Sequence, residues 1–281
     1  MYSQIRTSML DGICAMPVQV EVDISMGMPV FDMVGYLSPE VREAKERVRT
    51  ALHNCGILLP AKRITVNLSP ANIRKTGTGF DLPIAVALLV AMGLVKPEKC
   101  ADTIFSGELN LSGQLLPVRG ILPMVSDGVK EGIHKFVVPA DNLMESRLVQ
   151  GADVCGFPAL ESVIGYLQDG GYKEPAYAGQ RQNRSHGMPD FSEVNGQQFL
   201  KRAAEIAASG MHNMLMVGPP GAGKTMISER MATILPPLTK KEQLEVSKIY
   251  SVCGLLADSR TLLQERPFRS PHHTVSMAWL A

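Results

Sequence analysis

The sequence of 281 residues lacks the features that mark several specialised classes of protein. Its five cysteines are scattered and show no CxxC spacing, which argues against a disulfide framework or a zinc site and favours reduced thiols. The most apolar stretch, residues 82–95, is too short to span a bilayer and contains Pro83 and Gly93. The N-terminus shows no secretory signal. We therefore expect a cytoplasmic protein with no membrane partner.

An excess of charge of one sign is also missing. The formal net charge is +1, with 20% charged and 45% hydrophobic residues, which is ordinary for a soluble protein. This balance neither supports nor excludes a nucleic-acid partner, because a local basic patch would suffice. The length allows two domains, each with its own core.

The most informative segment that is present is a glycine-rich loop between an apolar segment, Met214–Val217, and a predicted helix from Met226 onward. This strand–loop–helix context is typical of a phosphate-binding loop. The loop residues are Gly218, Pro219, Pro220, Gly221, Ala222, Gly223, Lys224 and Thr225.

Each residue type in this loop has a chemical reason. The glycines let the backbone turn tightly, so that N–H groups at the start of a helix point at a polyphosphate. Lys224 would reach the β- and γ-phosphates, and the Thr225 hydroxyl would join the Mg²⁺ shell. A plain turn that opens a helix needs neither residue. The loop therefore predicts ATP and Mg²⁺ as cofactors, with Thr225 as the protein's metal contact.

Composition divides the chain at a polar segment that contains glycine and proline, residues 170–189. We expect an α/β domain over residues 1–169, an inter-domain linker over 170–189, and a second α/β domain over 190–281. Lys173, Arg181 and Arg184 of the linker are interpreted as solvated charge.

Alternating helix and strand signals occupy the first domain. Ser38-Pro39 predicts a helix start, and the helix should end at Gly56. Residues 82–92 predict a buried helix. Strands are expected at 63–68, 135–138 and 153–155, and a hairpin is expected from 103–109 and 114–118 around Ser112-Gly113.

In the second domain, a helix is expected over residues 196–209. The spacing of Thr239 and Glu242 is that of a capping box at the start of another helix, which should run to about Tyr250.

Several short stretches resemble, in chain order, the ComM/YifB family of magnesium-chelatase-like AAA+ proteins. They are Arg47–Arg49 with Ala51–Leu52, Lys62–Leu68, Gly79–Ala85, Gly107–Leu109, Pro117–Gly120, Val138–Ala140, Asp190–Phe191 with Gly196–Gln197, Gly218–Thr225 and Arg266–Thr274. The resemblance implies an α/β domain like the Lon protease domain (ribosomal S5 domain 2-like), followed by a partial P-loop AAA+ domain. It also implies an ATPase that remodels branched DNA, with branch-migration helicase-like activity, as a homo-oligomeric ring, a hexamer in the full-length protein.

The Lon resemblance raises the alternative of a serine peptidase. A Ser–Lys dyad needs a hydroxyl beside a lysine of lowered pKa. Gly79 stands where the serine belongs, and the segment of the lysine, Gly120–Met124, contains no lysine. Thr78 and Lys75 lie nearby in sequence but do not form the dyad pattern. We expect the fold to be kept and the proteolysis to be lost.

Other residues weighed as ligands have plainer interpretations. Asp81 and Arg119 are explained equally well by contacts within their own domain. His272 and His273 are adjacent and lack a third ligand nearby, so a metal site is not expected there. The resemblance places them in a loop of the ATPase core, where contact with DNA or another subunit is the expected use.

The acidic strand of an ATPase, which should follow the Arg266–Thr274 segment, is not found. Leu255–Asp258 imitates it but is interpreted as a loop. The chain departs from the family pattern at Trp279–Ala281 and stops. We therefore expect a chain that binds nucleotide but lacks full hydrolysis machinery. A non-catalytic protein-interaction module remains the alternative function.

Overall fold

The computed structural model describes residues 1–174, 190–256 and 260–271 of the chain. Packing divides the chain into two compact units, each of which is described separately. Unit 1 comprises Met1–Gln180 with Ser247–Thr261, and unit 2 comprises Arg181–Val246 with Leu262–Ala281. None of the helices in the described ranges combines the length and the apolar character that crossing a membrane requires.

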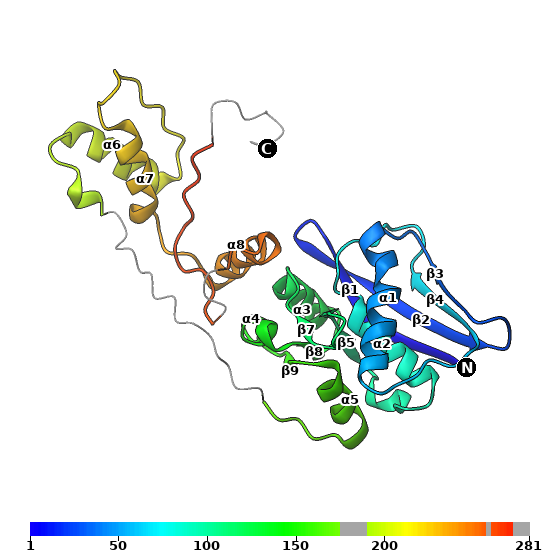
Figure 1. Ribbon diagram of the computed structural model, residues 1–281. Coiled ribbons are helices and arrows are strands. Elements are labelled where there is room, and N and C mark those ends of the chain that lie inside the picture. The colour runs from blue at the N-terminus through cyan, green and yellow to red at the C-terminus, as the bar shows by residue number, and fades with distance from the viewer. Residues whose placement is uncertain (175–189, 257–259, 272–281) are drawn as a thin grey trace. The chain divides into compact units, whose positions relative to one another are not determined.

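A mixed, mostly parallel sheet forms the centre of unit 1 (Figure 1). Its seven strands stand in the order β3-β4-β2-β1-β5-β8-β9. β2 pairs antiparallel with both β1 and β4, and the other pairings are parallel. The strands are β1 (Tyr2–Asp11), β2 (Cys14–Ser25), β3 (Val30–Val34), β4 (Arg63–Ser69), β5 (Thr103–Phe105), β8 (Lys135–Pro139) and β9 (Asp153–Phe157). The expected α/β class and the strands predicted at 63–68, 135–138 and 153–155 are confirmed.

The hairpin of β1 and β2 has no counterpart among the sequence predictions. Gly12, at φ +60°, allows the tight connection between the two strands. Along β2, Val18, Val20, Val22 and Ile24 are buried at every second position. Such alternation is the signal of a half-buried strand, and it is visible in the sequence.

Helices α1 (Pro39–Asn54) and α2 (Asp81–Ala91) confirm two predictions. α1 begins at Pro39 as expected, although Ser38 supplies no side-chain cap. Every residue of α2 is buried, because this helix packs against β1 and β2 on one side and against α1 on another. The lack of a polar face in the sequence of α2 follows from this position.

Helix α3 (Ile121–Lys130) covers the opposite face of the sheet. Ser3 donates a hydrogen bond from its Oγ to the carbonyl of Ala87 on α2, at 2.7 Å. The Leu10 side chain contacts Gly120 at the start of α3. A Cβ added to Gly120 would lie only 2.4 Å from Leu10 Cδ1. Ser3 and Leu10 stand an odd number of residues apart on β1, and side chains so spaced point to opposite faces. The remaining helices of unit 1 are η1 (Pro97–Lys99), η2 (Ala140–Asn142), α4 (Leu143–Ser146) and α5 (Leu160–Asp169).

The hairpin expected from residues 103–109 and 114–118 is shorter than predicted. β5 joins the large sheet, and only β6 (Glu108–Leu109) and β7 (Leu115–Leu116) pair as a hairpin. Asn110 shapes its turn, because its Oδ1 accepts hydrogen bonds from the backbone of Ser112 and Gln114. The first segment was predicted too long because the chain changes sheets after Phe105.

The described part of unit 2 is helical. It contains η3 (Phe191–Glu193), α6 (Gln198–Gly210), α7 (Lys224–Ile234) and the first half of α8 (Lys240–Cys253). The helix predicted over 196–209 is confirmed by α6, with slightly shifted ends. The strand expected at Met214–Val217 is not formed, and Leu215 and Val217 are 88% and 89% exposed. A strand needs a hydrogen-bonded neighbour, and the described residues of unit 2 contain no strand to pair with it.

The capping box that opens α8 is present. The Thr239 N–H donates to Glu242 Oε2 at 2.8 Å, and the Glu242 N–H donates to Thr239 Oγ1 at 3.3 Å. The second half of α8, from Ser247, packs within unit 1. Of the linker expected at 170–189, residues 175–189 lie outside the described residues. Glu174 forms an ion pair with Arg147 at 2.7 Å.

Candidate functional site

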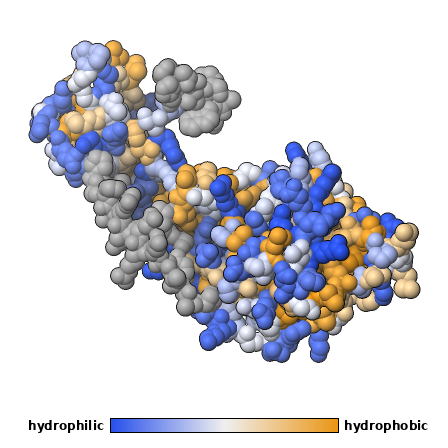
Figure 2. Space-filling model, in the orientation of Figure 1, coloured by the Kyte–Doolittle hydropathy of each residue, from blue (hydrophilic) through white to orange (hydrophobic). Residues whose placement is uncertain are grey.

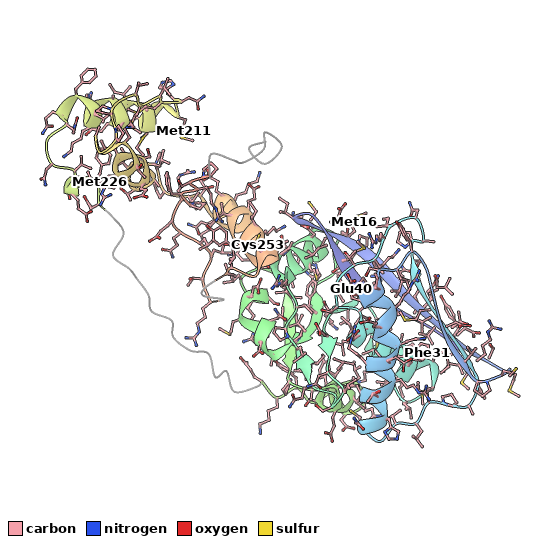
Figure 3. The ribbon with its side chains drawn as sticks, turned by 45° about the horizontal axis from the view of Figure 1, so that its top comes forward. Met16, Phe31, Glu40, Met211, Met226 and Cys253 are labelled. Carbon is pink, nitrogen blue, oxygen red and sulfur yellow. The ribbon has the colours of Figure 1, made fainter. Side chains whose placement is uncertain are left out.

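The glycine-rich loop of unit 2 adopts a backbone that other residue types disfavour. Gly221 and Gly223 have φ values of +81° and +80°, in the left-handed region. The loop turns at Pro220 and Gly221, and α7 starts directly after it at Lys224. Figure 3 labels Met226 in the first turn of this helix. The predicted loop and the helix behind it are therefore formed without help from a preceding strand.

The start of α7 presents unpaired donors. The first hydrogen bond of the helix runs from the Ile227 N–H to the Gly223 carbonyl, at 3.0 Å. The N–H groups of Lys224, Thr225 and Met226 precede it and have no acceptor within the helix. These groups, together with the helix dipole, favour a bound anion at this end.

Lys224 adds a full positive charge to this end of the helix. Its Nζ donates to the carbonyls of Gly218 and Pro219, each at 2.8 Å. Within the described ranges Lys224 takes part in no ion pair. A phosphate oxygen could therefore replace the two neutral acceptors without first breaking a salt bridge.

Thr225 is exposed at the beginning of the helix, so its hydroxyl is available to a metal ion that arrives with a nucleotide. Groups of three or more His, Cys, Asp or Glu side chains able to hold a metal are absent from the described part of the chain. The donor set present thus fits Mg²⁺ carried by a polyphosphate, which supplies most of its own oxygen ligands. It does not fit a metal ion bound by protein side chains alone.

An ion pair fixes α7 within unit 2. Arg230 donates from its Nε to Glu193 of η3 at 3.2 Å and from its Nη1 to the Met226 carbonyl at the same distance. The Arg230 guanidinium lowers the pKa of the Glu193 carboxyl. Ile227 is fully buried beneath the loop end of the helix. These contacts hold the helix start in place while leaving the loop itself exposed.

The segment that resembles the ATPase core is only partly described. Arg266 donates to the Pro236 carbonyl at 2.7 Å and to Glu242 at 3.3 Å, so it holds its own segment against the start of α8. His272, His273 and Asp258, weighed above as metal ligands or as the end of an acidic strand, lie outside the described residues, as does Trp279–Ala281.

The structure brings together the two segments that would form a peptidase dyad. An added Cβ at Gly79 would lie 2.9 Å from Ser106 Oγ. That hydroxyl is buried and donates to Met124 Sδ at 3.7 Å. Gly79 and the Gly120–Met124 segment therefore both lie beside Ser106. The group next to the Ser106 hydroxyl is the Met124 thioether, and a thioether cannot act as a base. The geometry does not support proteolysis.

Lys75 supplies no base either. It is fully buried and donates to the carbonyls of Pro70 and Ile73, which hold it in place. Burial lowers the pKa of its ammonium. Thr78 is half-buried, and no hydrogen bond joins it to Lys75 within the described part of the chain.

Asp81 and Arg119 make contacts within unit 1. Asp81 is fully buried at the start of α2 and forms a two-pronged ion pair with Arg47 of α1, at 2.7 and 2.9 Å. Burial raises the pKa of the Asp81 carboxyl, and the Arg47 guanidinium opposes this rise. Arg119 is exposed, and its side chain lies beside Gly254. A Cβ added to Gly254 would lie 3.1 Å from Arg119 Nε. The pairing of Asp81 agrees with a structural role.

Two family models match most of the chain. The model described as subunit ChlI of Mg-chelatase matches residues 20–142, and the model described as magnesium chelatase, subunit ChlI, matches residues 190–281. A weaker similarity to Lon protease 1 of Sorangium cellulosum, 27% identical over 135 residues, covers 44% of this chain and 16% of that protein. The Lon likeness agrees with an α/β fold.

Three curated relatives are similar over nearly the whole chain. An uncharacterized protein of Mycobacterium tuberculosis is 40% identical over 266 residues, covering 94% of this chain and 52% of its own length. The uncharacterized protein YifB of Escherichia coli is 39% identical over 275 residues, covering 98% and 54%. Competence protein ComM of Haemophilus influenzae is 38% identical over 278 residues, covering 97% and 53%.

The chain thus spans about half the length of the curated relatives it matches. The two magnesium-chelatase models flank the linker region predicted from composition, and the second of them contains the whole glycine-rich loop. On these matches, the chain belongs to the ComM/YifB family of magnesium-chelatase-like proteins.

Proposed function

We propose that this chain binds ATP with Mg²⁺ through the loop Gly218–Thr225. The backbone from Pro219 to Gly223 and the first N–H groups of α7 would surround the phosphates. Lys224 would neutralise the terminal phosphates, and the Thr225 hydroxyl would contribute to the Mg²⁺ shell. The nucleotide would supply the polyphosphate and the metal, and the chain would supply the positive charge and the donors.

The observation that carries this proposal is the backbone of the loop itself. Two glycines in the left-handed region directly precede a helix that starts on a lysine. Glycine adopts this backbone conformation without strain, whereas other residue types would not, so the two glycines permit the tight turn that a phosphate-binding loop needs ahead of its helix. A lysine whose acceptors, among the described residues, are two loop carbonyls suits the same role.

Nucleotide binding can be tested on the full chain with a fluorescent ATP analogue and with thermal unfolding. We expect Mg·ATP to raise the melting temperature and Lys224→Ala to abolish both the shift and the fluorescence change. Lys240→Ala, an exposed lysine at the start of α8, is the matched control and should bind like the unmodified chain. Equal binding by the Lys224→Ala variant, or no binding by the unmodified chain, would refute the proposal.

We further propose that hydrolysis by this chain alone is very weak. After Thr225 the sequence shows no apolar run that ends in Asp-Glu, the pattern of the acidic strand that orients the attacking water in an ATPase. Steady-state phosphate release, with Lys224→Ala as the background, measures this directly. Rapid turnover above that background would show that an acidic residue outside the described ranges completes the site.

By family resemblance, we propose that the full-length protein is a cytoplasmic ring-forming ATPase, a hexamer, that remodels branched DNA. The support is family membership and the similarity to a competence protein. Analytical ultracentrifugation of the full-length protein with Mg·ATP, and unwinding of a synthetic four-way junction, test assembly and activity separately. A monomer that leaves the junction intact under conditions of nucleotide binding would contradict this part.

A protein-interaction role for unit 1 is the second candidate. The observation that favours it is an exposed strand edge with apolar side chains beside a basic groove, and neither feature includes a residue of the glycine-rich loop.

A further inference from the structure

Strand β3 forms one edge of the seven-stranded sheet, where it pairs with β4 alone among the described strands. An edge strand presents unpaired backbone N–H and C=O groups along its free side. Natural proteins usually blunt such edges with charge or proline. In β3, Val30 and Val34 are instead 40% and 49% exposed, and Asp32 between them is paired with Arg63. The edge therefore exposes two valines and carries a single charged pair, Asp32 with Arg63.

More apolar surface continues beyond both ends of this strand. Met26 and Met28 are each 86% exposed, and Tyr36 is 55% exposed. Figure 2 shows a broad apolar area on this part of unit 1, near the connection between β2 and β3. Contiguous exposed apolar surface of this kind is typical of an interaction site.

A groove of about 390 Å³ lies beside the edge. Its apolar side chains come from β3, β4 and the segment after α1, and they include Phe31, Ile57, Leu59 and Ile64. Phe31, labelled in Figure 3, also packs against the core of unit 1. Leu58, which also lines the groove, is 71% exposed. The groove thus combines a packed apolar floor with an accessible rim.

Among the described residues, the groove is lined by two cationic side chains and one histidine, and by no acidic side chain. Arg49 and His53 contribute from α1, and Lys62 contributes from the segment that leads into β4. Neither Arg49 nor Lys62 takes part in an ion pair within residues 1–174. Acidic side chains are absent from the groove lining, and the acidic residue of the adjoining strand, Asp32, is already held by Arg63. Negative charge on a ligand would therefore strengthen its binding to this groove.

We propose that an extended acidic segment of a partner protein binds here by adding a strand to the free edge of β3. Its backbone would pair with β3, and alternate side chains would point toward the groove, as in other cases of strand addition. Apolar side chains would fill the floor, and glutamate or aspartate side chains would meet Arg49 and Lys62. Backbone hydrogen bonds to the free strand edge would supply affinity, and Arg49 and Lys62 would favour a peptide with negative charge.

A second copy of this chain fits this surface less well than an acidic peptide. Pairing of two β3 edges around a two-fold axis would bring the same basic groups toward each other, and like charges across an interface oppose association. An exposed strand edge also distinguishes a peptide from a compact anion, because a compact anion would leave the backbone groups of β3 unused.

The probe is a fluorescein-labelled ten-residue peptide of alternating valine and glutamate, titrated into the full chain by fluorescence anisotropy. Saturable binding that weakens with salt is expected, with no binding of the valine–lysine counterpart. Arg49→Glu combined with Lys62→Glu should weaken binding roughly tenfold or more, since two attractions become repulsions. The control is Arg42→Glu, an exposed arginine of α1 outside the groove, which should bind normally.

Strand addition itself is tested with two further peptides, N-methylated on alternate residues. A strand uses the N–H groups of alternate residues toward one neighbour, so one methylated peptide should lose binding and the other should keep it. Equal binding of both would overturn the strand-pairing model. Equal binding of the acidic and basic peptides, binding by labelled oligothymidine in place of the acidic peptide, or dimerisation that the groove variants abolish would each overturn the choice of partner.

Discussion

Lys248 of α8 donates a hydrogen bond to Asp127 of α3 at 2.9 Å, and the two side chains are only 9% and 16% exposed. They lie 121 residues apart in sequence, and both belong to unit 1. The Gly120 N–H, at the start of α3, donates to the Ser251 carbonyl at 3.1 Å. These contacts hold the C-terminal half of α8 (Lys240–Cys253) against α3 within unit 1. Figure 3 labels Cys253 at the end of α8.

The Asp127 carboxylate should stabilise unit 1 in a pH-dependent way. Burial opposes its ionisation, but hydrogen bonds from Lys130, Lys248 and the Ala15 N–H outweigh burial and lower its pKa. A lowered pKa gives stability that is present above the unfolded value, about 3.9, and that is lost as pH falls through the folded value. Asp127→Asn should therefore cost about 2 kcal/mol near pH 7 and progressively less below pH ~4.

Urea unfolding of both proteins across this pH range measures the difference. Glu131→Gln, an exposed change at the residue that follows α3, is the control and should cost little at any pH. A cost for Asp127→Asn that stays constant down to acid pH would contradict this prediction.

The pair of Arg47 and Asp81 should matter far more than a surface pair. Asp81→Asn leaves a partly buried guanidinium without its carboxylate, and we expect a loss of about 3 kcal/mol. Asp102→Asn makes the same change in an exposed pair with Arg6 and should cost less than about 1 kcal/mol. Asparagine tolerates the positive φ of Asp102, so backbone strain does not enter the comparison. Equal costs in denaturant titrations would show that burial does not decide the strength of the pair.

The loop conformation can be tested with two Gly→Ala changes. An added Cβ meets nothing within 4 Å at either Gly221 or Gly165, but only Gly221 has a positive φ. Gly221→Ala should cost about 1–2 kcal/mol in loop formation and weaken Mg·ATP binding. Gly165→Ala, inside α5, should instead stabilise by about 0.5–1 kcal/mol. Calorimetry with nucleotide titration separates the two effects, and undiminished binding by Gly221→Ala would mean that the loop rearranges on binding.

Restoring a serine at the peptidase position should not restore a peptidase. Gly79→Ser would drive a side chain into Ser106 Oγ and should destabilise by about 1–3 kcal/mol. The added change Ser106→Ala should recover part of this loss. Neither variant should cleave a fluorogenic casein substrate, because Met124 occupies the place of a base. Cleavage that appears with Gly79→Ser would refute this view of the site.

Local signals in the sequence predicted much of the fold. The apolar face that follows Ser38-Pro39 marks α1, and the alternation at 63–68 marks β4. The spacing of Thr239 and Glu242 marks the start of α8, and the structure contains their reciprocal hydrogen bonds. These features depend on residues within a few positions of each other, so that periodicity and capping chemistry suffice to identify them.

The Met214–Val217 segment shows where local signals fail. Its composition indicates a strand, but a strand forms only beside a paired neighbour. The sheet of unit 1 shows the same dependence, because Phe105 ends a strand of the large sheet and Glu108 starts a separate hairpin. Which neighbour a strand finds depends on the whole fold.

The sequence by itself determined the α/β class and the family, and it predicted a phosphate-binding role for the glycine-rich loop, because residue types, spacings and similarity over short stretches carry that information directly. The tertiary structure decided three other matters. It brought Lys248 to Asp127, it placed Ser106 between Gly79 and Met124, and it left the apolar edge of β3 beside Arg49 and Lys62. The reason is that each of these arrangements joins residues distant in sequence, whose proximity results from the packing of the sheet and helices and not from any local pattern.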